Sequence, residues 1–173
     1  MKNLYESLLD DFEKLKDSIN PIDEIKRFLK DNYLHSYRFK ISEKPNKDGF
    51  YEVSCDKFFI YAKKDIVSLT NDLFVFANAF GFDCSSCPNL KSLKGAPKEV
   101  EKTFECQLCC NLTSLEGAPE KVGVFNCTVC ANLKSLKGAP EKVGSNFFCS
   151  GCGEKFTYED IGNVSNVKGY TKR

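Results

Sequence analysis

The chain has 173 residues, of which 42 % are apolar and 28 % are charged, and its formal net charge is +1. These values are ordinary for a soluble globular protein of one or two small domains, and they exclude a chain dominated by disorder. The balanced charge argues against nucleic-acid binding, and no run approaches the ~20 apolar residues that cross a membrane.

Residues 1–65 predict a capping region of two helices followed by two strands. Apolar residues between Leu4 and Leu15 recur at helical spacing, and Asn20-Pro21 is typical of a helix start. Apolar residues alternate over 37–41 and again over 51–55, as in strands. The N-terminus reaches Asp10-Asp11 before any apolar run develops, so we expect no signal peptide and a cytoplasmic protein.

A repeat occupies residues 66–152. Phrases of the type Leu-x-Ser-Leu begin at positions 66, 90, 112 and 133, and three of them continue into Gly-Ala-Pro. Each is followed by an aromatic-x-Cys-x-x-Cys segment, in which Phe and the first Cys lie two residues apart and therefore share one face of a strand. Self-similarity at 20–30 residues predicts a solenoid, here of about four coils.

Residues 153–173 predict a C-terminal cap. Thr157-x-x-Asp160 resembles a capping box at the start of a short helix that carries Ile161 and Val164. The predicted fold class is therefore α+β: a solenoid of about four coils with an N-terminal αα-ββ cap and a short C-terminal helical cap, which cover the apolar faces of the end coils.

The repeat resembles the leucine-rich-repeat family. The family's aliphatic-x-x-aliphatic-x-aliphatic-x-x-Asn/Cys pattern matches Val122-x-x-Phe125-x-Cys127-x-x-Cys130, although Glu101 and Gly144 hold the first position in neighbouring units. The sequence of the repeat units resembles short cysteine-containing repeat proteins of bacteriophages and gut bacteria, over roughly residues 66–173. The resemblance implies an interaction scaffold, possible phage origin, action on a host or virion protein, and the host cytoplasm as location.

The repeat cysteines admit two interpretations. Cys is often buried and behaves as a small apolar residue, so a ladder of reduced, metal-free thiols in the core explains spacing that equals the repeat period. The alternative is zinc bound by four-thiolate sites, because paired Cys-x-x-Cys units are a zinc signal; disulfides or an iron–sulfur cluster are less favoured. The two zinc sites would use Cys84, Cys87, Cys106 and Cys109, and Cys127, Cys130, Cys149 and Cys152.

The outward residues of the repeat strands are the predicted recognition surface. Alternation places eight side chains there: Asp83, Ser85, Glu105, Gln107, Asn126, Thr128, Phe148 and Ser150. Their mixed character suits a protein partner. We expect no enzymatic activity, because His35 is the only histidine and the sequence shows no nucleophile–base pair or phosphate-binding loop. The expected function is protein–protein interaction or scaffolding, with zinc binding as the alternative.

Overall fold

The computed structural model describes residues 20–32, 39–59 and 63–169, and these form a solenoid with a body made mostly of sheet. The helix predicted over residues 4–15 and the solitary His35 lie outside the described residues. The described elements are α2 (Pro21–Asn32), β1 (Lys40–Ile41), β2 (Tyr51–Phe59), β3 (Phe74–Asp83), β4 (Glu99–Glu105), β5 (Lys121–Asn126), β6 (Lys142–Phe148), α3 (Tyr158–Val164) and β7 (Asn166–Gly169).

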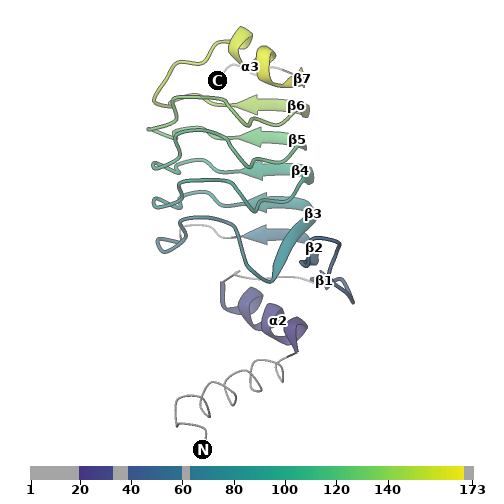
Figure 1. Ribbon diagram of the computed structural model, residues 1–173. Coiled ribbons are helices and arrows are strands. Elements are labelled where there is room, and N and C mark those ends of the chain that lie inside the picture. The colour runs from purple at the N-terminus through teal and green to yellow at the C-terminus, as the bar shows by residue number, and fades with distance from the viewer. Residues whose placement is uncertain (1–19, 33–38, 60–62, 170–173) are drawn as a thin grey trace, which may run out of the picture.

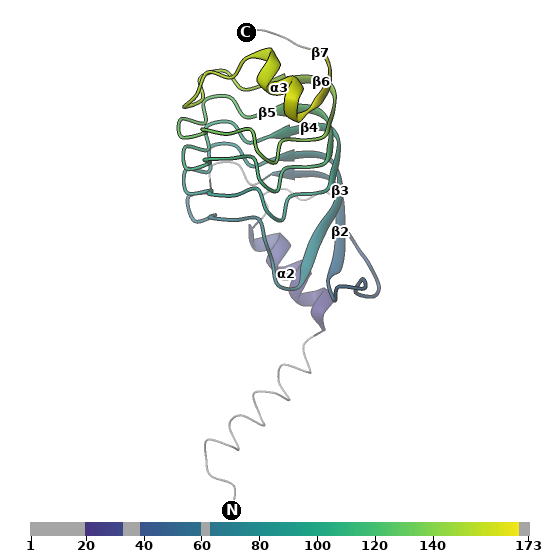
Figure 2. The same ribbon diagram turned by 45° about the horizontal axis from the view of Figure 1, so that its top comes forward.

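All seven strands belong to one sheet, in which their spatial order equals their order in the sequence. β1 pairs with β2 in the antiparallel sense, and every later pair is parallel. Figure 1 shows the resulting stack of coils, with α2 at one end and α3 at the other. The tilted view in Figure 2 shows turns and loops completing each coil away from the strands.

Identical side chains stack because the strands pair in register. Val100 lies beside Val122, and Val122 beside Val143. The rings of Phe82, Phe104 and Phe125 form a second row, with successive centroids 5.3 and 5.5 Å apart and planes within 5° and 2° of parallel. These residues are almost fully buried. One coil therefore supplies half of each core contact, and its neighbour supplies the other half.

The Gly-Ala-Pro corners require glycine for two reasons. Gly95, Gly117 and Gly138 have positive φ angles of 93°, 90° and 82°, which side chains disfavour. A Cβ at any of them would also lie under 3 Å from the backbone of the preceding coil, as at Gly95 against Leu69. Close stacking of the coils thus explains why this residue recurs in each complete repeat.

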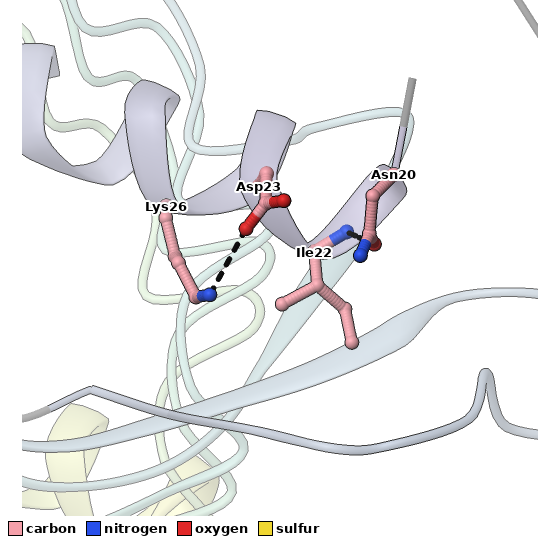
Figure 3. Close-up of polar contacts among 4 residues, drawn as sticks. All are labelled: Asn20, Ile22, Asp23 and Lys26. Atoms are coloured by element: carbon pink, nitrogen blue, oxygen red, sulfur yellow. Dashed lines mark hydrogen bonds and ion pairs between the residues drawn. The ribbon is translucent and has the colours of Figure 1, made fainter. Parts of the chain in front are cut away.

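The N-terminal end of the stack is covered by α2. The side-chain oxygen of Asn20 accepts a hydrogen bond from the Ile22 amide at 3.0 Å, which confirms the predicted N-cap (Figure 3). Asp23, beside the cap, pairs with Lys26 on the exposed side of the helix. The opposite side of α2 buries Ile25 and Leu29 completely.

At the C-terminal end, α3 begins with the predicted capping box. The Thr157 hydroxyl accepts from the Asp160 amide, and the Asp160 carboxylate accepts from the Thr157 amide. Ile161 is buried in the core, and Phe156 packs against it while half-buried. Val164 instead is exposed, so it does not join the apolar side expected of it.

The solenoid has about five turns, one more than the four that the sequence predicts. The difference arises in segments that the sequence pattern assigns to the caps. β2 pairs with β3 in parallel from Tyr51 to Phe59, and β7 pairs with β6 in the same way. Neither segment carries the Cys-x-x-Cys signature, so the repeat pattern misses them although their backbones extend the same sheet.

We expect a fragment of residues 66–173 to aggregate or fail to fold cooperatively. The truncation removes β2 and α2, and it therefore uncovers Phe74 and Phe76, which are 2 % and 3 % exposed in the intact chain. It also leaves the edge of β3 unpaired, which favours association with other chains. Size-exclusion chromatography and urea unfolding test this. A monomeric fragment with a single cooperative transition would contradict it.

Candidate functional site

The repeat cysteines form a ladder along the inside of the stack. Cys84, Cys106 and Cys127 continue the strand face that carries the Phe row, and each is fully buried. The second cysteine of each unit turns back inward because a residue with positive φ precedes it: Ser86, Leu108, Val129 and Gly151 occupy that position. Cys149 and Cys152, in the last unit, are only half-buried, whereas Cys110 is exposed as its position outside the repeat phase suggests.

Hydrogen bonds join the ladder diagonally from one coil to the next. The Cys109 thiol donates to the Cys84 carbonyl at 3.1 Å, Cys130 donates to the Cys106 carbonyl at 3.1 Å, and Cys152 to the Cys127 carbonyl at 3.2 Å. The same partners also interact through their side chains. The first cysteine of one coil is thus paired with the second cysteine of the next.

The first cysteine of each pair strongly favours the neutral thiol, whereas the side-chain hydrogen bond with Cys84 lowers the pKa of Cys109. Burial, reinforced by the neighbouring sulfurs, raises the pKa of Cys84, Cys106 and Cys127 well above the ordinary value. Burial also raises the pKa of the half-exposed Cys149 to about 11. The opposite direction holds for Cys152, whose pKa is lowered by its side-chain hydrogen bond with Cys127.

The pairing does not divide into the two four-cysteine sets that the zinc alternative requires. Cys106 and Cys130 belong to different sets, yet their side chains are hydrogen-bonded to each other. Within residues 20–32, 39–59 and 63–169, no three or more His, Cys, Asp or Glu side chains are arranged to hold one metal ion. No disulfide links the repeat cysteines, which are free thiols. The described geometry is that of paired thiols in an apolar core.

The predicted recognition residues lie at the carboxyl ends of the strands, where most of them bond to one another. Gln107 donates to the Glu105 carboxylate at 3.2 Å, and Thr128 donates to the Asn126 side-chain oxygen at 2.9 Å. Longer contacts of 3.5 and 3.4 Å connect Asn126 and Thr128 to Gln107. These polar atoms therefore stabilise the stack of strand ends before they meet any partner.

The recognition residues at and after the ends of β3 and β6 do not join this network of polar side chains. Asp83 accepts from the Ser85 amide, but Ser85 itself is 1 % exposed, so its predicted outward placement is wrong. Alternation along a single strand does not show what covers the first coil. Phe148 is half-buried at the other end, and only Ser150 among the eight is exposed.

A groove of about 980 Å³ crosses the same sheet near the amino-terminal ends of the strands, away from the strand ends that carry the predicted recognition residues. It is lined by residues of all seven strands, with at most three consecutive residues from any one of them. Its charged lining consists of three acids and three lysines: Lys40, Asp56, Glu99, Glu101, Lys121 and Lys142. Phe80, which is 40 % exposed, supplies an aromatic surface.

Gly123 and Gly144 form the floor of the groove over β5 and β6, and the difference in length between alternate strands requires glycine at Gly123. Three residues separate the Val and Phe rows in β4 and β6, whereas two separate them in β5. The extra residue of β4 turns the carbonyls of Glu101 and Lys102 towards Gly123, where an added Cβ would lie 2.5 Å from each. At Gly144 an added Cβ would make only an ordinary contact, 3.5 Å from Gly123.

The repeat motif does not indicate this groove, because the residues between each Val and the following Phe lie outside the motif. The change from Glu101 to Gly123 and Gly144 at one repeat position is the signal that the sequence offers. Asp56 gave no signal, because β2 lacks the repeat motif and its place beside β3 depends on strand pairing.

No protein-family model matches the sequence, and no curated protein or solved structure is significantly similar to the chain. In the part of the chain that the structure describes, neither helix is long and apolar enough to span a bilayer.

The two groove glycines give a matched test of the strand geometry. Gly123→Ala is expected to destabilise the fold by about 1–3 kcal/mol, because the methyl group overlaps the two carbonyls of β4. Gly144→Ala has room for its methyl group and is expected to change the free energy of unfolding by less than about 1 kcal/mol. Urea unfolding of both variants measures the difference, and equal losses would contradict the bulge geometry.

A second prediction separates the thiol ladder from a structural metal site. Replacing Cys127 by Ala should cost about 1–2 kcal/mol, as for a small buried apolar group, and replacing it by Val should cost less. Loss of a structural zinc ligand would be far more damaging, because metal affinity is folding free energy in such sites. Elemental analysis accompanies the unfolding measurements. Close to two zinc ions per chain, together with unfolding by a chelator, would contradict the ladder.

The raised thiol pKa values also predict a pH dependence. In the unfolded chain these thiols ionise near pH 9, whereas Cys84, Cys106 and Cys127 stay protonated in the folded protein, where their pKa is higher. The folded state therefore binds more protons above pH 9, so the free energy of unfolding falls there, by up to about 1.4 kcal/mol per pH unit for each thiol.

Unfolding curves between pH 8 and pH 10.5 measure this slope. Cys106→Val should make it shallower by one thiol's contribution, whereas Cys110→Ser, at an exposed position, should leave it unchanged. The pKa values of Cys109 and Cys152 are lowered by hydrogen bonds with Cys84 and Cys127, which the Cys106 substitution leaves in place. A slope that is the same in all three proteins would show that the buried thiols do not cause it.

Proposed function

We propose that this protein is a non-enzymatic interaction module that binds a protein partner across the groove on its sheet. The observation that carries the proposal is the groove itself, which all seven strands line and whose charged side chains are exposed. Solenoids expose a long continuous surface of this kind because each coil adds one strand to it. The equal number of acids and lysines favours a protein over a nucleic-acid backbone, which calls for a basic surface.

The polar ladder at the strand ends has a supporting role in this proposal. Glu105, Gln107, Asn126 and Thr128 bond to one another, so they hold the ends of β4 and β5 at a constant separation. A rigid row of strands loses little conformational entropy when a partner binds, which favours affinity. The thiol ladder also makes the row of strands rigid, because it packs as an apolar layer inside the coils. We assign it no catalytic role.

We extend the proposal to origin and location on the repeat pattern alone. The Cys-containing Leu-x-Ser-Leu and Gly-Ala-Pro units support membership of the leucine-rich-repeat class and an origin in a bacteriophage, with action on a host or virion protein. The ten cysteines support a reducing compartment, the host cytoplasm, because burial of neutral thiols requires no disulfide.

Two lysine variants test whether the groove is the binding surface. Lys142 lines the groove, whereas Lys134 lies on an exposed turn outside it, and the structure shows only backbone hydrogen bonds for both. Lys142→Glu and Lys134→Glu change the net charge equally. Proteins captured from the native host by the unmodified chain should be retained by Lys134→Glu and lost with Lys142→Glu.

A partner found in this way is purified and its affinity measured directly. We expect Lys142→Glu to weaken binding about tenfold or more, because the new carboxylate repels the acidic group of the partner that Lys142 attracts. Equal affinity of the two variants would exclude the groove, and the absence of any partner that binds the purified chain would contradict the proposed function.

A further inference from the structure

The groove has one long axis, and this axis runs across the strands. Its lining extends from Lys40 on β1 to Asn166 on β7, which is six strand spacings or about 29 Å. Along any strand it is no more than three residues wide, about 10 Å. Such a long, narrow depression suits a single extended polypeptide segment of about nine residues, and it is too narrow for a second folded domain to fill.

Charge is distributed unevenly along this axis. Asp56, Glu99 and Glu101 lie on β2 and β4, whereas two of the three lysines, Lys121 and Lys142, lie on β5 and β6 and the third, Lys40, lies on β1. Glu99 and Lys121 neutralise each other through a contact of 2.6 Å. Glu101 has only a 3.9 Å contact with Lys102, between two well-exposed side chains, and such a contact contributes little.

After this pairing, the two sides of the groove retain opposite charges. Glu101 and Asp56 are left on the β1–β4 side, where Lys40 offsets one of their two negative charges, and Lys142 is left on the β6 side. No ion pair joins Asp56 or Lys142 to another described residue. Gly123 and Gly144 occupy on β5 and β6 the position that Glu101 holds on β4, directly after the paired Val residues, and they leave the backbone uncovered. A bound segment can therefore approach the sheet closely at this point.

The spacing of these charges defines the spacing in the partner. Glu101 on β4 and Lys142 on β6 are two strand spacings apart along the axis of the groove, about 9.6 Å. They are also offset by two residues along the strands, about 7 Å, because Lys142 lies in register with Glu99. A polyproline-II segment rises about 3.1 Å per residue with three residues per turn, so its side chains at positions i and i+3 share one face and are about 9.3 Å apart. The two distances along the axis agree, and the long side chains of Glu101 and Lys142 reach a segment that lies between them.

We propose that the groove recognises an extended segment of a partner protein that carries a basic and an acidic residue three positions apart. The basic side chain pairs with Glu101, and the acidic side chain pairs with Lys142. Small residues between them lie over Gly123 and Gly144. The inference rests on the proposed function, and it adds the conformation and charge pattern of the segment.

Selection from a library of random nonapeptides displayed on beads tests the pattern, with the full chain as bait. The unmodified protein should enrich peptides with Lys or Arg and Asp or Glu at a separation of three residues. The double variant Glu101→Lys/Lys142→Glu should enrich the opposite order. The order must invert whichever way the peptide lies, which makes the comparison independent of its direction.

Circular dichroism establishes that the double variant is folded, and the neutral pair Glu101→Gln/Lys142→Met replaces it if it is not. The neutral pair should lose the charge preference. For a peptide selected by the unmodified chain, fluorescence anisotropy should show affinity that falls as sodium chloride rises from 50 to 500 mM. A twenty-residue oligothymidylate should not compete with it, since the groove has no net charge.

Enrichment without the spaced charges, the same peptides with both baits, no enrichment, or competition by the oligothymidylate would each overturn the inference. A failure of the proposed function is distinguishable from a failure of this inference. If Lys142→Glu abolishes capture of a protein partner but no peptide is enriched, the groove binds a folded surface, and only the extended-segment inference is lost.

Discussion

In-register pairing of parallel strands is the constraint on which this structure depends. It places each Phe beside the Phe of the next coil and each Val beside the next Val, so a short unit becomes a continuous core only by repetition. The nearly parallel rings of Phe82, Phe104 and Phe125 show how closely the coils follow one another. Every other feature, from the glycine corners to the thiol ladder, depends on this constant spacing.

The same constraint explains the use of cysteine. A residue two positions after Phe points into the coil where neighbouring coils approach closely, and a thiol fills this place with little volume. The thiol also donates a weak hydrogen bond to a carbonyl of an adjacent coil, as Cys84 does to Glu105. Burial then keeps the proton on the sulfur, and the ladder is stable as a neutral layer.

The groove arises where the register is broken. The Val and Phe rows are both continuous, but two or three residues separate them in alternate strands, and the difference is absorbed as a bulge between each pair. The bulge excludes a side chain at Gly123 and opens the sheet surface at the point where charged residues of several strands meet. Bulges often redirect side chains near functional sites, and here one leaves the backbone of the sheet uncovered within the groove.

The sequence by itself determined the local and periodic features. The helix starts at Asn20 and Thr157, the glycine corners and the burial of Phe104 and Cys106 follow from spacing and side-chain type, which act over a few residues or one repeat. Tertiary structure alone decided the fifth turn, the burial of Ser85 and the groove. Each of these depends on pairing between segments that do not share the repeat motif, or on residues that stacking brings together from different strands. The sequence of a single repeat unit contains no information about either.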